Sequence, residues 1–372
     1  MADSTALKRL RQQAALAAFP APVPLGRVFQ RLGFVQADPI RAPARAQDLI
    51  LRHRVAFYRA GDLERRFARL GLEEAYLYAY GFMTPDLHAL LLPRHDPAGA
   101  HVPRGLAAEV LEFVRAAGPT HPAALAEKFG RARETNGWGG VSKATTRALH
   151  ALQHHGLLRV AGRKSGIRVY QAVAAPDRAL SPGERLERLA LAVAGILAPV
   201  QATSLAATMA PILRSVAGPG GGKGTLAALL ARGALLEELV DGVRYLRPAG
   251  PERAGPERAG PGAAGRVGRK VRFLAPFDPL VWDRRRFEHL YGWPYRFEAY
   301  VPPAKRKLGY YAMPLLWADR VIGWVNVLRP GGRIEVKAGF VGRRPAEAGF
   351  TAAFDEEVAR MDHFLSSPGE DG

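Results

Sequence analysis

The sequence predicts an α+β fold in which helical modules with short hairpins precede a small antiparallel sheet or barrel. Two segments, residues 106–173 and 181–246, each have the order helix, short helix, helix and two strands. A third helix followed by a hairpin is the order of a winged helix. Beyond residue 270 the hydrophobic pattern changes to that of strands. We therefore expect tandem winged-helix modules followed by a C-terminal β-barrel or β-sheet.

The first repeat, residues 106–173, has the predicted elements of a winged helix and a strong positive charge. Periodic apolar residues predict helices at 106–117 and 122–129, and Ser142 is expected to cap a third helix that runs to residue 155. A hairpin follows at 157–160 and 167–170. From Arg131 to Arg168 there are eight Lys or Arg and one acidic residue, so the charge falls on the helix and wing that would touch DNA. A solvated basic face on a protein-binding winged helix is the alternative.

The remaining elements are predicted in the same way, from periodicity and turn residues. The second repeat is expected to have helices at 183–197, 202–209 and 223–233 and strands at 235–239 and 243–246. An amphipathic helix is expected at 6–18, and helices at 25–32 and 44–52 indicate a degraded third copy. C-terminal strands are expected at 271–274, 296–301, 308–316, 320–328 and 333–340, with a closing helix at 351–364. The repeated GPERA string predicts a flexible loop. The expected domains are 1–100, 101–178, 179–247, the loop 248–270, and 271–372.

The charge balance points to a polyanionic partner. The 372 residues include 53 Lys and Arg against 34 Asp and Glu, a formal net charge of +19. A surface of this sign attracts nucleic acid, and double-stranded DNA is the expected partner. An arginine-rich composition inherited from a GC-rich genome is the alternative explanation. The absence of Cys excludes disulfides and cysteine zinc sites, and the histidines lack metal-binding spacing, so no metal or cofactor is expected.

Segments for export or membrane insertion are not predicted. The basic N-terminal helix lacks the apolar core of a signal peptide. The longest apolar stretch, 189–200, is about half of the ~20 residues that a membrane span needs. We therefore expect a soluble, cytoplasmic and nucleoid-associated monomer that has no membrane partner.

One short motif contains candidate catalytic residues. Gln36 and Asp38 stand two residues apart in Gln36-Ala37-Asp38, which places both side chains on one face of an extended backbone. From the spacing alone, the polar face of a strand is the favoured explanation of this motif, because a triplet of this kind holds little information.

Two long strings are far more specific. They are LAPFDPLVWDRRR at 274–286 and YRFEAYVPPAKRKLGYY at 295–311. Through them the chain resembles the winged-helix DNA glycosylases of the YcaQ/AlkZ type, which release bulky N-alkylated purines and unhook interstrand crosslinks. The resemblance extends weakly over most of the chain.

The resemblance implies a catalytic role for Gln36 and Asp38, because the family carries catalysis on a Gln-apolar-Gln or Gln-apolar-Asp triplet near the N-terminus. It predicts a DNA repair glycosylase that hydrolyses the N-glycosidic bond of bulky N7-alkylated purines. No Lys lies near the triplet in the sequence, so water is the expected nucleophile. Where the related proteins have a His-Glu pair, this chain has Ala79-Tyr80, which leaves crosslink activity open. The neighbouring aromatic residues Tyr78, Tyr80 and Phe82 are candidates for stacking on a base, or for core packing.

DNA affinity is expected to come from basic residues on the helices, the wings and the C-terminal strings. These are Arg45, Arg52, Lys143, Arg147, Arg163, Lys164, Arg168, Arg284, Arg286, Lys305 and Arg306. The alternative function is a non-catalytic winged-helix DNA-binding protein or transcriptional regulator, which would use the same basic surfaces but prefer particular duplex sequences.

Overall fold

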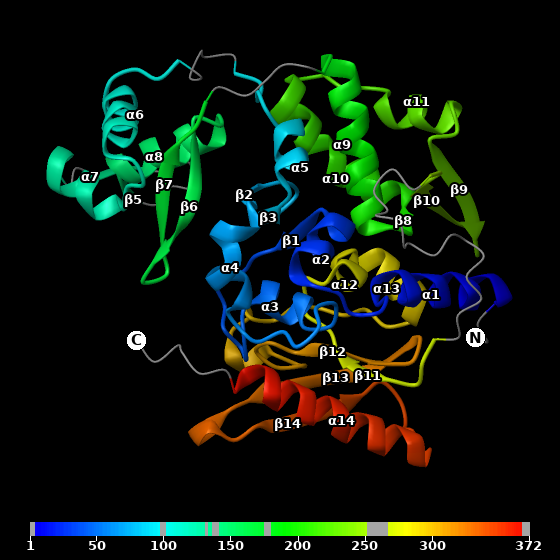
Figure 1. Cartoon of the computed structure of the whole chain (residues 1–372). Helices are drawn as coiled ribbons and strands as arrows, with labels where there is room; N and C mark the ends of the chain where they lie inside the picture. Colours follow the sequence, from blue (N-terminus) through cyan, green and yellow to red (C-terminus); the bar gives the residue numbers. More distant parts are fainter. Residues whose placement is uncertain are drawn as a thin grey trace. The chain divides into compact units, whose positions relative to one another are not determined.

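The computed structural model describes residues 4–96, 102–130, 133–135, 141–174, 180–250 and 267–366 (Figure 1). The chain divides into two compact units that are discontinuous in sequence. Unit 1 comprises residues 1–63, 191–207 and 226–371, and unit 2 comprises 64–190 and 208–225. None of the helices in these described ranges is long and apolar enough to span a membrane.

Unit 1 begins with three helices and a short strand. They are α1 (Thr5–Ala18), α2 (Leu25–Leu32), β1 (Phe34–Gln36) and α3 (Ala46–Leu51). Gly33 ends α2 with a positive φ of 72°, a conformation that glycine adopts without steric cost. The chain then turns directly into β1, where Phe34 and Val35 are each 1 % exposed. This burial fixes the backbone immediately before the Gln36 motif.

The C-terminal part of unit 1 is an open antiparallel sheet in the order β11-β12-β13-β14. Its strands are β11 (Val271–Phe273), β12 (Met313–Trp317), β13 (Arg320–Leu328) and β14 (Glu335–Phe340). Among the described residues β11 and β14 pair on one side only, so of the two predicted forms the sheet is present and the barrel is not. Figure 1 shows α14 (Ala348–Leu365), in red, along this sheet, where Phe350 packs edge-on against Trp317.

Between β11 and β12 lie short helices and one long irregular loop. The helices are α12 (Pro279–Trp282), α13 (Arg284–Tyr291) and the 3-10 turn η1 (Pro303–Lys305), and a second 3-10 turn, η2 (Pro330–Gly332), precedes β14. The strand predicted at 296–301 is wrong, since these residues are irregular. The physical reason is Glu298, whose buried carboxylate accepts N–H groups of the loop and holds it in a compact turn.

Unit 1 also contains a second small sheet, in the order β8-β10-β9. Its strands are β8 (Val200–Gln201), β9 (Leu235–Val240) and β10 (Val243–Pro248). The helices of this stretch of chain are α9 (Pro182–Leu197), α10 (Ala202–Ala217) and α11 (Thr225–Ala231). Residues up to 190 in α9 and from 208 in α10 belong to unit 2. Helix α10 is longer than predicted and contains Pro211. Most of the predicted loop 248–270 falls on residues 251–266, which lie outside the described residues.

Unit 2 holds the first predicted repeat. Its N-terminal elements are α4 (Asp62–Leu70), β2 (Glu73–Tyr76), β3 (Tyr80–Met83) and α5 (Pro85–Leu90). They are followed by α6 (Leu106–Ala117), α7 (Pro122–Phe129), β4 (Arg133–Thr135), β5 (Val141–Lys143), α8 (Ala144–His154), β6 (Leu158–Lys164) and β7 (Ile167–Ala172). The cap predicted at Ser142 is wrong, because Ser142 lies in β5 and Lys143 occupies the N-cap of α8. The order of three helices and a terminal hairpin is as predicted, with the β4–β5 pair inserted.

Candidate active site

The Gln36 motif stands where β1 ends. Gln36 is the last residue of β1, and Ala37 and Asp38 continue beyond the strand. The Asp38 carboxylate accepts an N–H bond from Ile40 at 2.8 Å, which folds the chain back after the strand. The Asp38 backbone N–H donates to the Oε1 of Gln47 in α3, at 3.4 Å. Asp38 is therefore held through its carboxylate by the backbone that follows it and through its own N–H by α3.

Asp38 is half-buried, and its environment disfavours the charged form. Burial raises the pKa of the carboxyl above its usual range, and the hydrogen bond from Ile40 opposes this effect. A carboxylate that has lost hydration but keeps open oxygen positions is suited to act on a water molecule or on a developing positive charge.

The Gln36 side chain has an unused acceptor. Its Oε1 atom is buried and has no hydrogen-bond partner among the described residues. Because a buried polar atom without a partner costs free energy, such an atom indicates a place for water or substrate. Gln36 and Asp38 together therefore present oxygen atoms that can still accept hydrogen bonds from water or substrate.

Three tyrosines from the second family string belong to the surroundings of Asp38. Partial desolvation and then the negative charge of Asp38 raise the pKa of Tyr300. Burial and then the same charge hold the pKa of Tyr311 well above its usual range. The neighbouring Tyr310 also raises the pKa of both phenols through its charge. The reasoning from sequence did not assign these tyrosines to the site, although the string that carries the family resemblance contains all three.

Glu298 builds the loop that carries these tyrosines. Its Oε2 accepts the backbone N–H groups of Lys307 at 2.8 Å, Leu308 at 2.7 Å and Gly309 at 3.3 Å. Asn326 of β13 donates to the Leu308 carbonyl at 2.7 Å. Gly309 has a φ of 121°, and a Cβ there would collide with Asn326, so only glycine fits this approach. The tyrosines are thus placed by a rigid, internally bonded loop.

Buried ion pairs fix the segment after α3. Arg54 makes two bonds to the carboxylate of Asp278, at 2.7 and 3.0 Å, and donates to the Ile50 carbonyl. Asp278 is 0 % exposed and also caps α12 through the Leu280 N–H. Nearby, Arg52 pairs with the buried Glu357 of α14 at 2.8 Å. The Arg54 pair connects the segment after α3 to the first family string, and the Arg52 pair connects it to α14.

Tyr58 connects the same segment back to α3. Its hydroxyl donates to Asp48 at 2.6 Å and accepts the Leu63 N–H at 3.1 Å. Asp48 is adjacent to Gln47, which bonds the Asp38 backbone. The motif, α3 and the following turn therefore form one hydrogen-bonded body.

Several arginines predicted to contact DNA are instead engaged inside unit 1. Arg286 is 1 % exposed, and its guanidinium donates to the carbonyls of Leu197, Pro199 and Pro279. The Arg52 side chain is 4 % exposed in its pair with Glu357. Arg284 donates to two backbone carbonyls. Burial corrects the expectation for Arg286 and Arg52, because a guanidinium enclosed by carbonyls or a carboxylate has no surface to offer a phosphate.

The arginines of the β6–β7 hairpin are partly engaged within unit 2. Arg163 and Arg168 both donate to the buried carboxylate of Glu74, the Arg168 bond being 3.0 Å long. Their side chains remain 21 % and 28 % exposed. Among the other predicted DNA contacts, Lys143, Arg147, Lys164 and Lys305 are exposed, while Arg45 and Arg306 are half-buried.

The aromatic residues predicted near the β2–β3 hairpin differ in exposure. Phe82 is 1 % exposed and packs edge-on against Phe67, so the stacking role considered for it is corrected to core packing. The Arg168 guanidinium covers the Tyr80 ring at 4.4 Å from its centroid. Tyr78 is half-buried in the turn of the hairpin.

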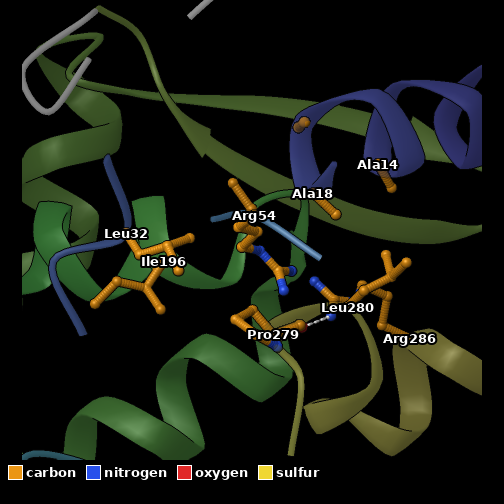
Figure 2. Close-up of a pocket in the computed structure, with 10 residues that line it drawn as sticks. Ala14, Ala18, Leu32, Arg54, Ile196, Pro279, Leu280 and Arg286 are labelled. Atoms are coloured by element: carbon orange, nitrogen blue, oxygen red, sulfur yellow. Dashed lines mark hydrogen bonds between the residues drawn. The ribbon is translucent and has the colours of Figure 1, made fainter. Parts of the chain in front are cut away.

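A small cavity lies elsewhere in unit 1, beside Arg54 and Arg286 (Figure 2). Its volume is about 20 Å³, which holds about one water molecule. A purine does not fit there. The half-buried Asp38 and the exposed Tyr300 and Tyr310 mark the candidate substrate site. Within the described ranges, no group of three or more His, Asp or Glu residues is arranged to hold a metal ion.

Comparison with known proteins identifies a family and a similar fold. Residues 29–364 match the family model described as DNA glycosylase AlkZ-like. The fold is similar to that of the DNA glycosylase AlkZ of Streptomyces sahachiroi, with a TM-score of 0.59 and 17 % sequence identity. That comparison covers 98 % of this chain and 97 % of the other. The matched range includes both halves of the candidate site. These are Asp38 and residues 298–311, the tyrosine loop, which carries Tyr300, Tyr310 and Tyr311.

Proposed function

Because the chain belongs to the AlkZ-like DNA glycosylase family, and is therefore a hydrolase of N-glycosidic bonds, we propose that it releases bulky N7-alkylated purines at Gln36 and Asp38. The observation that carries this proposal is a pair of side chains at the end of β1 that keep unused hydrogen-bond acceptors. One is the carboxylate of Asp38, and the other is the amide of Gln36, whose buried oxygen has no partner among the described residues. Family membership favours the enzyme over a transcriptional regulator.

The proposed mechanism follows from the substrate. Alkylation at N7 makes the purine cationic, so its glycosidic bond is already weak and the base leaves as a neutral molecule. The ionised Asp38 stabilises the positive charge that develops on the sugar and takes a proton from the attacking water. The free Oε1 of Gln36 accepts a hydrogen bond from that water. The bond from water to the anomeric carbon replaces the bond to the base, and the product is an abasic site.

The test is release of the base from a duplex oligonucleotide containing a single N7-alkylated guanine. The expected products are free alkylguanine and a strand that breaks only after alkali treatment. Lys305 and Lys307 lie on the tyrosine loop, so borohydride trapping is included to detect an amine nucleophile. Trapped enzyme or strand cleavage without alkali would overturn the water mechanism, and absence of released base would overturn the function. A crosslinked duplex assayed in parallel tests whether a chain with Ala79-Tyr80 unhooks crosslinks.

The raised pKa of Asp38 predicts the pH dependence. The carboxylate is the active form, and burial favours the protonated form, so protonation occurs at a higher pH than in a free aspartate, whose pKa is ~3.9. We expect single-turnover base release to be constant near neutral pH and to fall on acidification before that value is reached. The profile is measured from about pH 3 to 8, with the slow residual release by Asp38→Asn as the control. An acid limb at the pKa of free aspartate would contradict this assignment.

We further propose that α6, α7, α8 and the β6–β7 hairpin act as a winged helix that holds duplex DNA. This proposal is supported by their order and by the exposed Lys143, Arg147 and Lys164 at the start of α8 and on the hairpin. Arg163 and Arg168 keep only partial exposure for this role.

Salt dependence tests this DNA surface. Each phosphate contact contributes about −0.9 to the slope of log affinity against log salt. We expect Lys164→Ala to weaken binding to all duplex sequences equally and to reduce the slope by ~0.9. Lys337→Ala, which changes an exposed lysine of β14, is the matched control and should leave the slope unchanged. Equal slopes for Lys164→Ala and wild type would remove Lys164 from the DNA surface.

A further inference from the structure

The tyrosine loop has a feature that the proposed mechanism does not use, a large exposed aromatic face. Tyr300 is 77 % exposed and Tyr310 is 43 % exposed, although both belong to a loop whose backbone is closely bonded. Tyrosine rings in folded proteins usually bury most of their area. Two such rings held out on a rigid loop beside Asp38 indicate a ligand with a flat surface.

Aromatic side chains pack against the tyrosines that form this exposed face. Phe297 packs edge-on against Tyr300 with ring centroids 6.0 Å apart, and against Tyr311 with centroids 5.2 Å apart. Phe277, from the first family string, packs against Phe297 at 5.0 Å. The Arg306 Nε donates to the Val301 carbonyl at 2.7 Å. The Tyr300 ring therefore packs on a cluster of aromatic rings in edge-to-face contact, which limits the ordering that ligand binding requires.

A second, independent observation points to a polar ligand at the same place. Tyr311 is 3 % exposed, and its hydroxyl has no hydrogen-bond partner among the described residues. A buried hydroxyl normally has a partner, so this donor is available to a ligand group. The unpartnered Gln36 Oε1 repeats the same pattern at the motif.

The structure already shows a cation on one of these rings. The Arg306 guanidinium lies 4.9 Å from the centroid of Tyr310. Aromatic faces carry partial negative charge and attract cations, more strongly when water is excluded. The net negative charge of Asp38 nearby adds to this attraction for a positive ligand.

We propose that Tyr300 and Tyr310 form a wall beside Asp38 on which the cationic purine stacks, with Tyr300 as the main stacking face. This inference rests on the proposed function and adds a specificity determinant to it. N7-alkylated purines carry a positive charge that unmodified purines lack, so the wall selects the damaged base through its charge and holds it while Asp38 acts on the sugar. Tyr300 is a positioning residue for the sugar chemistry and a contact residue for the base.

Binding measurements test the wall without requiring catalysis. Three duplexes carry the same 2′-fluoro sugar, which suppresses base loss, and differ at one base: unmodified guanine, 7-methylguanine and neutral 7-methyl-7-deazaguanine. The last two have the same shape and differ in charge. For wild type we expect the cationic duplex to bind more tightly than both others.

The variants separate stacking from other effects. Base–aromatic stacking contributes ~1–3 kcal/mol, so Tyr300→Leu should weaken binding to the cationic duplex ~10-fold. The same variant should leave binding to unmodified duplex unchanged, and Tyr300→Phe should retain the wild-type preference. Tyr76→Leu is the matched control, because Tyr76 is 57 % exposed on the other unit. An unchanged preference in Tyr300→Leu, or equal binding of the cationic and neutral isosteres by wild type, would overturn the wall.

The two proposals can fail separately. If wild type releases no base but Tyr300→Leu loses the preference for the cationic duplex, the catalytic proposal fails and the wall stands. If base release depends on Asp38 and Tyr300→Leu binds as wild type does, the wall fails and the catalytic proposal stands.

Discussion

Asp38→Asn is expected to lower single-turnover base release by ~100- to 10,000-fold, the range that a positioned acid or base contributes. Asparagine keeps the size of the side chain and can accept the Ile40 hydrogen bond that aspartate accepts at 2.8 Å. It cannot carry the negative charge that opposes the developing sugar cation, and it cannot take a proton from water. The measurement is the rate of alkylguanine release with enzyme in excess over the duplex.

Binding separates this loss from a loss of folding or affinity. Affinity for lesion-free duplex should be the same for Asp38→Asn and wild type, because phosphate contacts supply it. Asp355→Asn, at an exposed position of α14, is the control and should release base at the wild-type rate. Wild-type release by Asp38→Asn would remove Asp38 from catalysis, whatever the outcome at Tyr300.

Asp278→Ala is expected to lower the free energy of unfolding by about 3–5 kcal/mol, the usual cost of removing one partner of a buried ion pair. The substitution leaves the Arg54 guanidinium, 3 % exposed, without the carboxylate that neutralises it. It also removes the cap that the Asp278 side chain gives the Leu280 N–H at the start of α12. Urea unfolding followed by tryptophan fluorescence measures the change.

A double substitution tests the assignment to the ion pair. Arg54→Met with Asp278→Leu removes both charges and should be less destabilised than either single charge removal. Asp355→Asn should change the free energy of unfolding by no more than about 0.5 kcal/mol. If Asp278→Ala unfolds at the wild-type urea concentration, the pair does not anchor the motif segment.

Local patterns predicted the regular elements closely. Helices α2, α6 and α7 and strand β13 begin and end at the residues that the periodicity indicated. In these elements apolar spacing, an N-terminal Pro or a terminal Gly all indicate the same boundary. The strand predicted at 296–301 failed because a side-chain contact outside the local pattern decides the backbone there. Residues 296–301 have strand-like composition, but the Glu298 carboxylate organises them as a turn.

The candidate site was predictable only in part. The family resemblance identified Gln36 and Asp38, because the motif is local. The proximity of Tyr300 and Tyr311 to Asp38 is tertiary and leaves no periodic signal in the sequence. Composition also treats all arginines alike, although Arg54 and Arg286 neutralise or bind internal groups while Lys143 and Lys164 face solvent.

The anchoring of the motif by Arg52 and Arg54 has a consequence for protein synthesis. Gln36 and Asp38 leave the ribosome early, but the carboxylates that hold the following segment, Asp278 and Glu357, are translated late. A nascent chain that already displays the motif therefore lacks the groups that fix it. We expect the enzyme to become competent only when α14 has been made, so incomplete chains from interrupted translation create no abasic sites in the genome.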